Sequence, residues 1–261
     1  MEMGLRLTMT NLLKRLIPVA LILLAWSLCS YYGVWSAYIL PSPVQVWDTF
    51  LSMAESGELF IHVFASLTRV VAGFTIAFFF AFILGIIAGL KPSLSPYYNH
   101  IVEFFRNVPP LSLIPLLILW VGIGEESKLI IIILASFFPM FLNIKKGFGS
   151  CDPKLLEVGA VVGLNTRQRF LKIILPSAVP DILLGMKVGL GYSWRAIIGA
   201  EMIAAASGLG YFILDAQTMS RSDKVIVGIL VIGLLGVICD KAFSYVSKRF
   251  TRLGGIQNSW D

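Results

Sequence analysis

The chain of 261 residues is strongly apolar: 57% of its residues are hydrophobic and 14% are charged, and its mean hydropathy is +0.83. A soluble domain carries roughly 45–50% apolar and about 25% charged residues, so one water-surrounded core cannot bury this much apolar surface. The net charge of +6 would suit nucleic acid, but the basic residues lie mainly in alternate loops between apolar runs. This pattern is typical of membrane proteins, so we expect membrane lipid and no nucleic acid as partners.

Six apolar runs each approach the ~20 residues that a helix needs to cross about 30 Å of hydrocarbon. Their continuity, without the alternation of barrel strands, favours helices. The runs are Leu16 to about Tyr38, Thr68–Leu90, Tyr97–Trp120, Lys128–Asn143, Pro180–Ala206 and Lys224–Tyr245. We predict an all-α integral membrane protein of about six transmembrane helices, with segment 1–15, membrane domain 16–250 and tail 251–261. The spacings Ala81-Gly85-Gly89 and Gly185-Gly189 suit close helix packing within the chain.

The distribution of Lys and Arg predicts the orientation of these helices. The N-terminal segment, the second loop, the fourth loop and the tail hold three, one, six and four of these residues. The loops on the other side hold three, together with seven acidic residues. Because Lys and Arg are enriched in cytoplasmic loops, both termini and the loop 145–176 are predicted to be cytoplasmic, in a protein that crosses a plasma (inner) membrane several times.

The loop 145–176 is too long for a simple connector, and its residues predict a helix. Asp152 is a good N-cap before Pro153 at the first helical position. Gly163 can take the left-handed conformation that ends a helix, with Leu164 as its apolar follower.

A second short helix is predicted directly afterwards. Thr166 can cap a helix through Arg167–Leu175, which Pro176 is expected to end. The resulting hairpin is either an interfacial element without a partner or a docking element for a soluble protein.

The segment Glu157–Gly163, followed by Phe170, Ile174 and Leu175-Pro176, resembles the cytoplasmic "EAA" loop of permease subunits of binding-protein-dependent ABC importers. That pattern reads Glu-Ala-Ala, three residues and Gly, then a stretch that ends in Ile-x-Leu-Pro. Val-Gly replaces Ala-Ala here, whereas the spacing from Glu157 to Gly163 and the Leu-Pro end are intact. By this resemblance the helix is a coupling helix that sits in a cleft of an ATPase subunit. Its implied contact residues are Glu157, Gly159, Ala160, Gly163, Leu164, Asn165 and Arg167.

Further motifs are similar to the nitrate, taurine and aliphatic-sulfonate branch of this family. They are Leu40-Pro41-Ser42-Pro43, Ser66 to Val70, Arg106-Asn107-Val108-Pro109-Pro110, Trp120 to Glu125, Ala200-Glu201-Met202 and Ser207 to Gly210. The resemblance implies the MetI-like fold of a type I ABC importer permease, a permease homodimer, two cytosolic ATPase subunits and a periplasmic or lipid-anchored substrate-binding protein. ATP and Mg would be bound by the ATPase. The chain has no Gly-x-x-x-x-Gly-Lys-Ser/Thr phosphate loop, so we expect it neither to hydrolyse ATP nor to bind a cofactor.

Ionisable side chains within the predicted spans mark candidate positions on a substrate pathway, because each costs roughly 2.5–3.5 kcal/mol in a bilayer. Arg106 lies ~14 Å into its helix from Tyr97, just before Pro109-Pro110 must break the backbone hydrogen bonds. A broken helix at this depth is tolerated where it is shielded or lines a polar cavity, and there Arg106 and Asn107 would suit an anion. Alternatively, Arg106 pairs with Glu103 or a carbonyl and only steadies the kink.

The fifth run carries the other pathway candidates, Trp194, Arg195 and Glu201. Arg195 is ~22 Å and Glu201 ~31 Å beyond Pro180, so we expect Arg195 to face the pathway and Glu201 to act as a structural or gating carboxylate near the outer boundary. Their angular offset of about 120° disfavours an ion pair between them.

The two histidines and three cysteines show no spacing typical of a metal site. No cluster of nucleophile and base is visible, so neither a metal nor catalytic residues are expected. Arg69 is expected to pair near the outer boundary with His62 or with the acidic first loop.

The sequence therefore predicts a permease subunit that moves an organic sulfonate, taurine or nitrate-like anion into the cytoplasm. One alternative is a permease of the same class for a vitamin precursor such as a thiamine-pyrimidine. The other is an ATP-independent secondary transporter, which would need inverted repeats and coupling carboxylates near the midplane.

Overall fold

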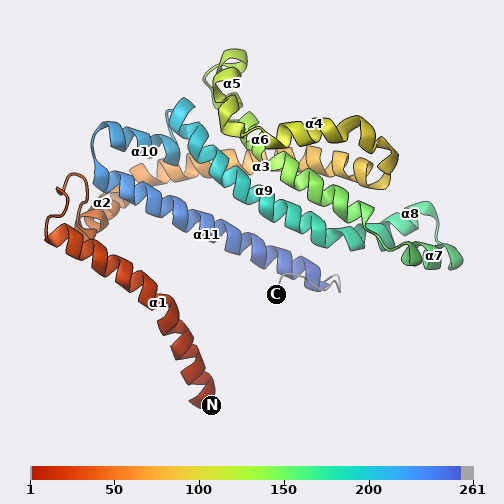
Figure 1. Cartoon of the computed structure of the whole chain (residues 1–261), viewed down its shortest axis with the longest axis horizontal. Helices are drawn as coiled ribbons and strands as arrows, with labels where there is room; N and C mark the ends of the chain where they lie inside the picture. The colour runs from red at the N-terminus through yellow and green to blue at the C-terminus, as the bar shows by residue number, and fades with distance from the viewer. Residues whose placement is uncertain (1, 254–261) are drawn as a thin grey trace. The chain divides into compact units, whose positions relative to one another are not determined.

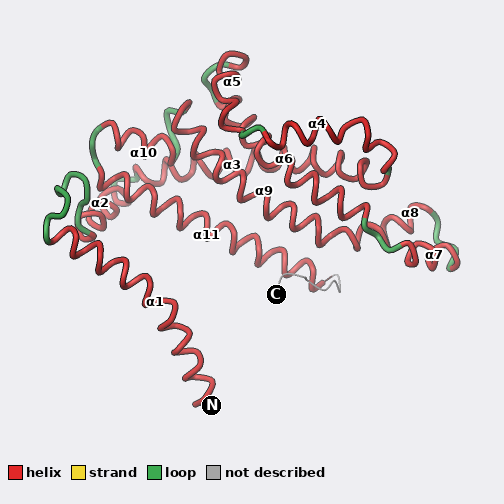
Figure 2. The backbone as a smooth tube through the Cα atoms, viewed as in Figure 1, coloured by secondary structure: helices red, strands yellow, loops and turns green. Residues whose placement is uncertain are grey.

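A computed structural model describes the backbone of residues 2–253 and the side chains of residues 16–249. That part of the chain consists of helices joined by turns (Figure 1, Figure 2), so the predicted all-α class is confirmed. In chain order the elements are α1 (Glu2–Tyr31), α2 (Pro43–Glu55), α3 (Glu58–Leu90), η1 (Pro92–Leu94), α4 (Ser95–Asn107), η2 (Pro110–Leu113), α5 (Ile114–Val121), α6 (Glu125–Gly149), α7 (Pro153–Val161), α8 (Thr166–Arg169), η3 (Phe170–Ile174), α9 (Leu175–Ala204), α10 (Leu209–Thr218) and α11 (Ser222–Leu253).

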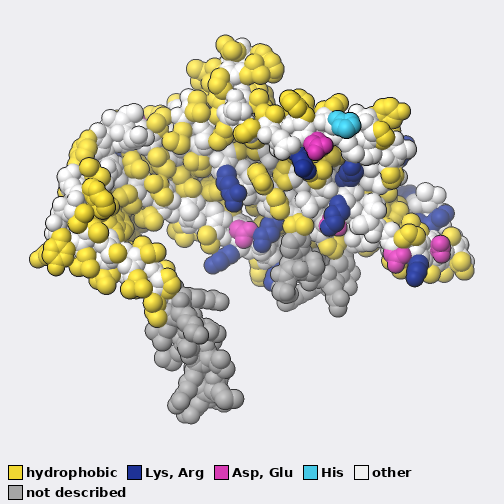
Figure 3. All heavy atoms as spheres, viewed as in Figure 1, with side chains coloured by type: hydrophobic (Ala, Val, Ile, Leu, Met, Phe, Trp, Pro, Cys, Tyr) yellow, Lys and Arg dark blue, Asp and Glu magenta, His cyan; other side chains and the backbone are white. Residues whose placement is uncertain are grey.

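Four helical stretches in the described residues are long and apolar enough to cross a membrane. They are α3, α6, the continuous run Thr166–Ala204 formed by α8, η3 and α9, and Ser222–Arg249 of α11. A bent pair, Pro92–Asn107 and Pro110–Val121, is long and apolar enough when taken together; its halves differ in direction by 87°, as in a broken span or a re-entrant loop. The first predicted run falls on α1, whose apolar part Leu16–Tyr31 is shorter. Figure 3 shows exposed apolar side chains over α1 and α5, as expected for surfaces that contact lipid.

The break expected at Pro109-Pro110 is confirmed. α4 ends at Asn107, Val108 and Pro109 are extended, and η2 begins at Pro110. Neither proline has an N–H to donate. The Pro109 carbonyl accepts hydrogen bonds from the Ser112 amide at 3.0 Å and from Ser112 Oγ at 2.7 Å, so this acceptor stays satisfied at the break.

One compact unit contains the chain up to Ile61 together with Phe212–Val231. Its helix α2 begins at Pro43 because Ser42 caps it, with Ser42 Oγ accepting from a backbone amide at 3.2 Å. Thr49 of α2 donates a hydrogen bond to Asp223 at 2.8 Å. α2 lies outside the predicted helices, although Ser-Pro is a typical signal for the start of a helix.

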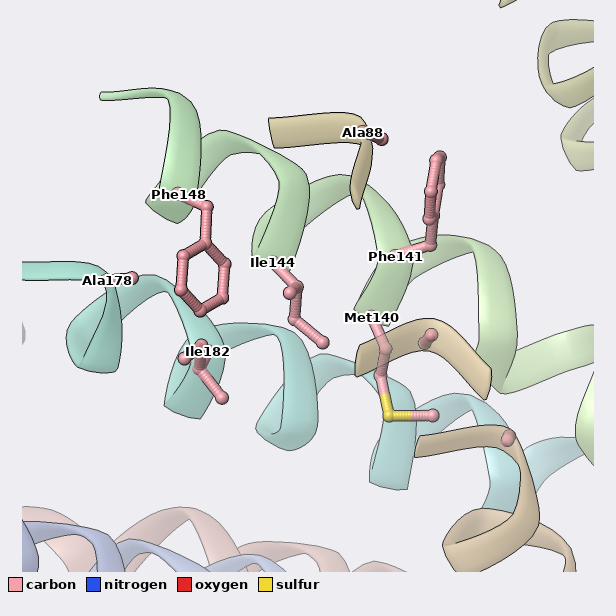
Figure 4. Packing of buried hydrophobic residues seen from close by; sticks show 9 residues of the cluster. Ala88, Met140, Phe141, Ile144, Phe148, Ala178 and Ile182 are labelled. Carbon is pink, nitrogen blue, oxygen red and sulfur yellow. The ribbon is translucent and has the colours of Figure 1, made fainter. Parts of the chain in front are cut away.

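The second unit, His62–Tyr211 with the chain from Ile232 onward, has its core where α3, α6 and α9 meet (Figure 4). Small residues let these helices approach: a Cβ added to Gly85 of α3 would lie 2.6 Å from Ile144 Cγ2, and one added to Gly189 of α9 would lie 2.6 Å from Met140 Cγ. The predicted packing role of the small-residue spacings is therefore confirmed. Buried residues of this core are Ala77, Ala81, Ala88, Met140, Phe141, Ile144, Phe148, Ala178 and Ile182.

The contact at Gly85 predicts a stability difference between two Gly→Ala variants. Gly85→Ala should lower the free energy of unfolding by about 1–3 kcal/mol, because the stiff, fully buried Ile144 cannot move away from the added methyl. Gly233→Ala is the matched control, since a Cβ there meets nothing within 4 Å, and it should stabilise α11 by up to about 1 kcal/mol. Thermal unfolding of the purified chain in detergent measures both. Equal effects of the two variants would contradict this account.

Candidate functional site

A pocket of about 300 Å³ lies beside the break between α4 and η2. Arg106 and Pro110 line it from the two sides of the break, and Tyr192 of α9 lines it from across. The exposed Arg106 makes no hydrogen bond or ion pair with another described residue. The alternative pairing with Glu103 is therefore not observed. The Glu103 carbonyl instead accepts a hydrogen bond from Asn107 Nδ2 at 2.7 Å.

Trp194 and Arg195 line a second pocket of about 380 Å³, formed mainly by α9 and α11. Lys187 and Asp240 line the same pocket, and their Nζ and Oδ1 atoms are 3.6 Å apart. The Arg195 guanidinium carbon lies 6.0 Å from the centre of the Tyr192 ring, a distance typical of a cation–π contact. Arg106 and Arg195 thus line two separate pockets, and Tyr192, which lines the first, also contacts Arg195.

Glu201 lines neither pocket, because it is buried in an ion-pair cluster. Its side chain is 0% exposed, and its Oε1 lies 2.8 Å from Nη1 of Arg69 on α3. The same guanidinium makes two hydrogen bonds, of 2.6 and 2.8 Å, to Glu125 at the start of α6. Lys128 lies 2.6 Å from Glu125 as well. The expected pairing of Arg69 with His62 or the first loop is wrong: its carboxylate partners come from α6 and α9.

This cluster also determines how α10 begins. The amides of Gly208, Leu209 and Gly210 donate hydrogen bonds to His62 Nδ1 at 3.2 Å, Ser66 Oγ at 2.9 Å and Glu201 Oε2 at 3.0 Å. The first amides of a helix have no partner within the helix, and α3 and α9 supply acceptors for them here. The start of α10 is therefore fixed by three distant side chains. His62 and Ser66 lie more than a hundred positions earlier in the sequence, and Glu201 lies nine positions before Gly210.

Two glycines are required by this arrangement. A Cβ added to Gly208, whose φ is +115°, would lie 2.2 Å from the Glu201 carboxyl carbon. One added to Gly210 would lie 2.2 Å from the Ile198 carbonyl oxygen. The two glycines of the motif Ser207 to Gly210 are thus explained by lack of space for a side chain. Arg69 also fixes the backbone of this motif by donating a hydrogen bond to the Ser207 carbonyl at 2.7 Å.

Sequence analysis identified the separate motifs of this cluster but not their contact. Ser66 to Val70, Trp120 to Glu125, Ala200 to Met202 and Ser207 to Gly210 each contribute at least one of its residues. The available signal was a polar or charged residue in each of several apolar segments, since such groups need partners in a membrane.

The helix predicted after Asp152 is confirmed as α7. Asp152 Oδ1 accepts from the Lys154 amide at 2.9 Å, with Pro153 at the first position. At the other end Gly163 has φ +78°, and the amides of Gly163 and Leu164 donate to the carbonyls of Ala160 at 3.0 Å and Gly159 at 2.9 Å. These two hydrogen bonds form a Schellman motif.

Two details of the second helix differ from the prediction. Asn165, not Thr166, is its N-cap, because Asn165 and Gln168 form a reciprocal capping box of 2.9 and 3.0 Å. Pro176 does not end it, because the π-helical turn η3 precedes Pro176 and the helix continues into α9.

The remaining coupling candidates lie on the surface of this hairpin. Glu157, Ala160 and Arg167 are exposed, whereas Gly159 is buried. A Cβ added to Gly159 would lie 2.6 Å from Ile173 Cδ1, so Gly159 allows α7 to pack on the second helix. Exposed apolar residues of the same hairpin are Leu155, Val158, Val161 and Val162.

Within the described residues, no three His, Cys, Asp or Glu side chains are grouped so that they could hold a metal ion. Three features together are typical of a membrane transport protein. They are several apolar spans, an unpaired arginine in a pocket at a broken helix, and a surface hairpin with an apolar face.

Comparison with known proteins identifies the family. The family described as "Binding-protein-dependent transport system inner membrane component" matches residues 81–252, and the chain belongs to it. A Bacillus subtilis protein described as an aliphatic sulfonates transport permease, SsuC, is 36% identical over 92% of this chain and 87% of its own length. The taurine transport system permease protein TauC of Escherichia coli is 33% identical over 89% and 86%. The nitrate import permease protein NrtB of a Synechocystis strain is 31% identical over 91% and 89%.

Solved structures show the same fold. A chain of the MetNI methionine ABC transporter in an inward-facing conformation aligns with a TM-score of 0.60 and 17% identity over 76% of this chain and 98% of that chain. A chain of an amino acid ABC transporter aligns with a TM-score of 0.61 and 18% identity over 78% and 97%. The predicted ABC importer permease fold is therefore confirmed, and the chain is a permease subunit of this transporter class.

The buried pair predicts unequal effects of two neutralised carboxylates. Glu201→Gln should lower the free energy of unfolding by about 3–5 kcal/mol, because it removes a partner from the buried Arg69 charge. Glu125→Gln should cost less, about 1–3 kcal/mol, because Glu125 is 57% exposed, although the buried Lys128 then loses its carboxylate partner. Thermal unfolding in detergent compares both with the wild type. A loss at Glu125 as large as that at Glu201 would show that burial does not set the strength of this cluster.

Proposed function

We propose that this permease imports a small oxyanion, such as an organic sulfonate, taurine or nitrate, into the cytoplasm. The observation that carries this proposal is Arg106, unpaired in a pocket at the break of a membrane span. A guanidinium presents paired N–H donors that match the geometry of oxyanions, and leaving it without a partner in a membrane is costly. The relatives named for sulfonates, taurine and nitrate support an anion over the thiamine-pyrimidine alternative.

The proposed pathway runs along the two pockets, past Tyr192, which lines the first pocket and contacts Arg195. Arg106, Asn107, Pro109 and Pro110 form the broken-helix side, and Trp194 and Arg195 form the α9 side. Glu201 is assigned a structural or gating role, because it is fully buried against Arg69 and cannot reach a solute in this conformation.

The assembly is proposed from the family and from the charge distribution. It contains two copies of this chain, two cytosolic ATPase subunits that bind ATP and Mg, and an external substrate-binding protein, in a bacterial inner (plasma) membrane. Both termini and the loop 145–176 are cytoplasmic in this proposal, since fourteen Lys and Arg lie on that side against three on the other.

The hairpin of α7 and α8 is proposed as the contact to the ATPase. Val161 and Val162 are 88% and 71% exposed, and large exposed apolar side chains typically mark an interaction surface. The caps at both ends of α7 make it a rigid element, which suits the transfer of a rigid-body motion.

Arg106→Gln should reduce transport while assembly stays intact. The system is the permease with its ATPase in liposomes, with the substrate-binding protein supplied outside and the uptake of labelled taurine or sulfonate measured. We expect a loss of tenfold or more, because the guanidinium charge is proposed to bind the anion. Arg106→Lys, which keeps the charge, should retain more uptake than Arg106→Gln.

The wild type should take up nothing without ATP, and uptake driven by an ion gradient alone would exclude the ABC permease function.

Gly163→Pro should uncouple ATP hydrolysis from transport. Proline fixes φ near −65°, whereas Gly163 has φ +78°, so the Schellman motif is lost and α7 changes its angle. We expect ATPase activity to persist while uptake falls, with normal membrane insertion. Glu157→Lys, on the exposed face of α7, should have the same effect.

Gly163→Asn is the control, because Asn adopts the left-handed conformation more readily than other non-glycine residues. It should preserve most of the uptake. Wild-type transport in Gly163→Pro and Glu157→Lys would remove the coupling role. Labelling of a variant that keeps only Cys151 tests the orientation, and reaction from outside the cell alone would place the hairpin on the wrong side.

A further inference from the structure

An apolar groove lies where α3, α4 and α6 meet, and it shares no lining residue with the two pockets of the proposed pathway. Its volume is about 270 Å³. Leu84 and Ile87 of α3 form an exposed rim, and Leu94 lies on the turn that follows α3. Phe141 of α6 is buried at its inner side, near Ala88 (Figure 4). The groove is therefore open at the surface of the membrane domain and closed toward the core.

The hydroxyl of Tyr98 is buried in this lining and has no hydrogen-bond partner among the described residues. Its ring is held in place, with an edge-to-face contact of 5.9 Å to Phe141. Buried hydroxyls nearly always have a partner, so this hydroxyl lacks an acceptor that a group bound in the groove could supply.

Two lysines lie close to groove residues in space or in the chain: the Lys145 ammonium lies over the Tyr98 ring, and Lys91 directly precedes the turn that contains Leu94. The Lys145 ammonium lies 5.0 Å from the centre of the Tyr98 ring and donates a hydrogen bond of 3.2 Å to Asn99 Oδ1. Lys91, in the turn just before Leu94, is exposed and pairs with no described residue. Neither lysine is neutralised by a carboxylate in the described part of the chain.

The position of Lys145 follows from helix packing. A Cβ added to Gly89 would lie 2.7 Å from the Lys145 carbonyl oxygen, so α3 and α6 touch backbone to backbone at this level. This contact fixes the Lys145 backbone next to the end of α3, beside the turn that carries Lys91. The basic end of the groove is thus built by the same small-residue packing as the core.

We propose that this groove binds one anionic phospholipid, with an acyl chain along Leu84 and Ile87 and the phosphate at Lys145 and Lys91. The Tyr98 hydroxyl would donate to an oxygen of the glycerol–ester region between these two parts. An apolar slot that ends at two unneutralised cations matches the two chemical parts of such a lipid, and basic pockets between transmembrane helices typically bind anionic headgroups. The lipid site is independent of the transported substrate.

A titration of the purified, delipidated full-length chain with phosphatidylglycerol, followed by native mass spectrometry, tests the proposal. Phosphatidylglycerol should bind more tightly than phosphatidylcholine. Lys145→Gln should weaken phosphatidylglycerol binding about fivefold, the effect typical of one basic residue near an anionic membrane surface. Lys146→Gln is the matched control, because the Lys146 ammonium pairs with Asp181 at 2.9 Å, whereas the Lys145 ammonium lies over the ring of the groove residue Tyr98, and it should leave the affinity unchanged.

A second measurement locates the bound lipid. Phosphatidylglycerol with a diazirine on its acyl chain should crosslink to peptides that contain Leu84, Ile87 or Leu94, and Lys145→Gln should reduce this yield. Equal affinity for both lipids, equal effects of the Lys145 and Lys146 variants, or crosslinks confined to other surfaces would each overturn the proposal. A disulfide between two chains through Leu84→Cys in membranes would also overturn it, because a second copy of the chain would then occupy the groove.

Discussion

The buried ion pair between Arg69 and Glu201 is the interaction on which the arrangement of α3, α6, α9 and the start of α10 depends. A carboxylate that is fully removed from solvent must be compensated by several donors, and Glu201 receives hydrogen bonds from Arg69, Ser66 and the Gly210 amide. Because these donors lie on α3 and α10, their hydrogen bonds to Glu201 hold α3, α9 and α10 together. The absence of side chains at Gly208 and Gly210 then follows, because the Glu201 carboxyl and the Ile198 carbonyl occupy the space where a Cβ would lie.

The arginines of the spans divide by their surroundings. Arg69 is 7% exposed and satisfied by two carboxylates and the Ser207 carbonyl, so its charge is neutralised within the fold. Arg106 lines a pocket without a partner, and Arg195 has a cation–π contact with Tyr192 but no hydrogen bond or ion pair among the described side chains. A cation that the fold leaves unpaired in a membrane span contributes little to stability. This contrast separates a structural arginine from two that are suited to a passing anion.

Local signals in the sequence predicted much of the fold, and long-range contacts limited the rest. The caps of α7, the left-handed Gly163 and the break at Pro109 follow from the conformational preferences of a few neighbouring residues. The partners of Arg69 could not be predicted in this way, because Glu125 and Glu201 lie 56 and 132 positions away and no local rule selects them. Pro176 was misread for a related reason: a helix-breaking residue acts locally, but the π turn before it gives the backbone another way to continue.

The failure of Pro176 to break the helix has a mechanical consequence. Thr166–Ala204 is one continuous helical stretch, so α8 of the hairpin that is proposed to contact the ATPase is helically continuous with Tyr192, Arg195 and Glu201, and α7 packs on this stretch through Gly159 and Ile173. Arg167 and Arg195 are separated by about 42 Å along this helix. A displacement at the hairpin can therefore reach the pocket-lining residues along a single helix. We expect any bending at the π turn and at Pro180, where helices typically kink. A flexible connector at Pro176 would instead have absorbed the motion before it reached either pocket, which is why the unbroken helix supports coupling better than the two separate helices that the sequence predicted.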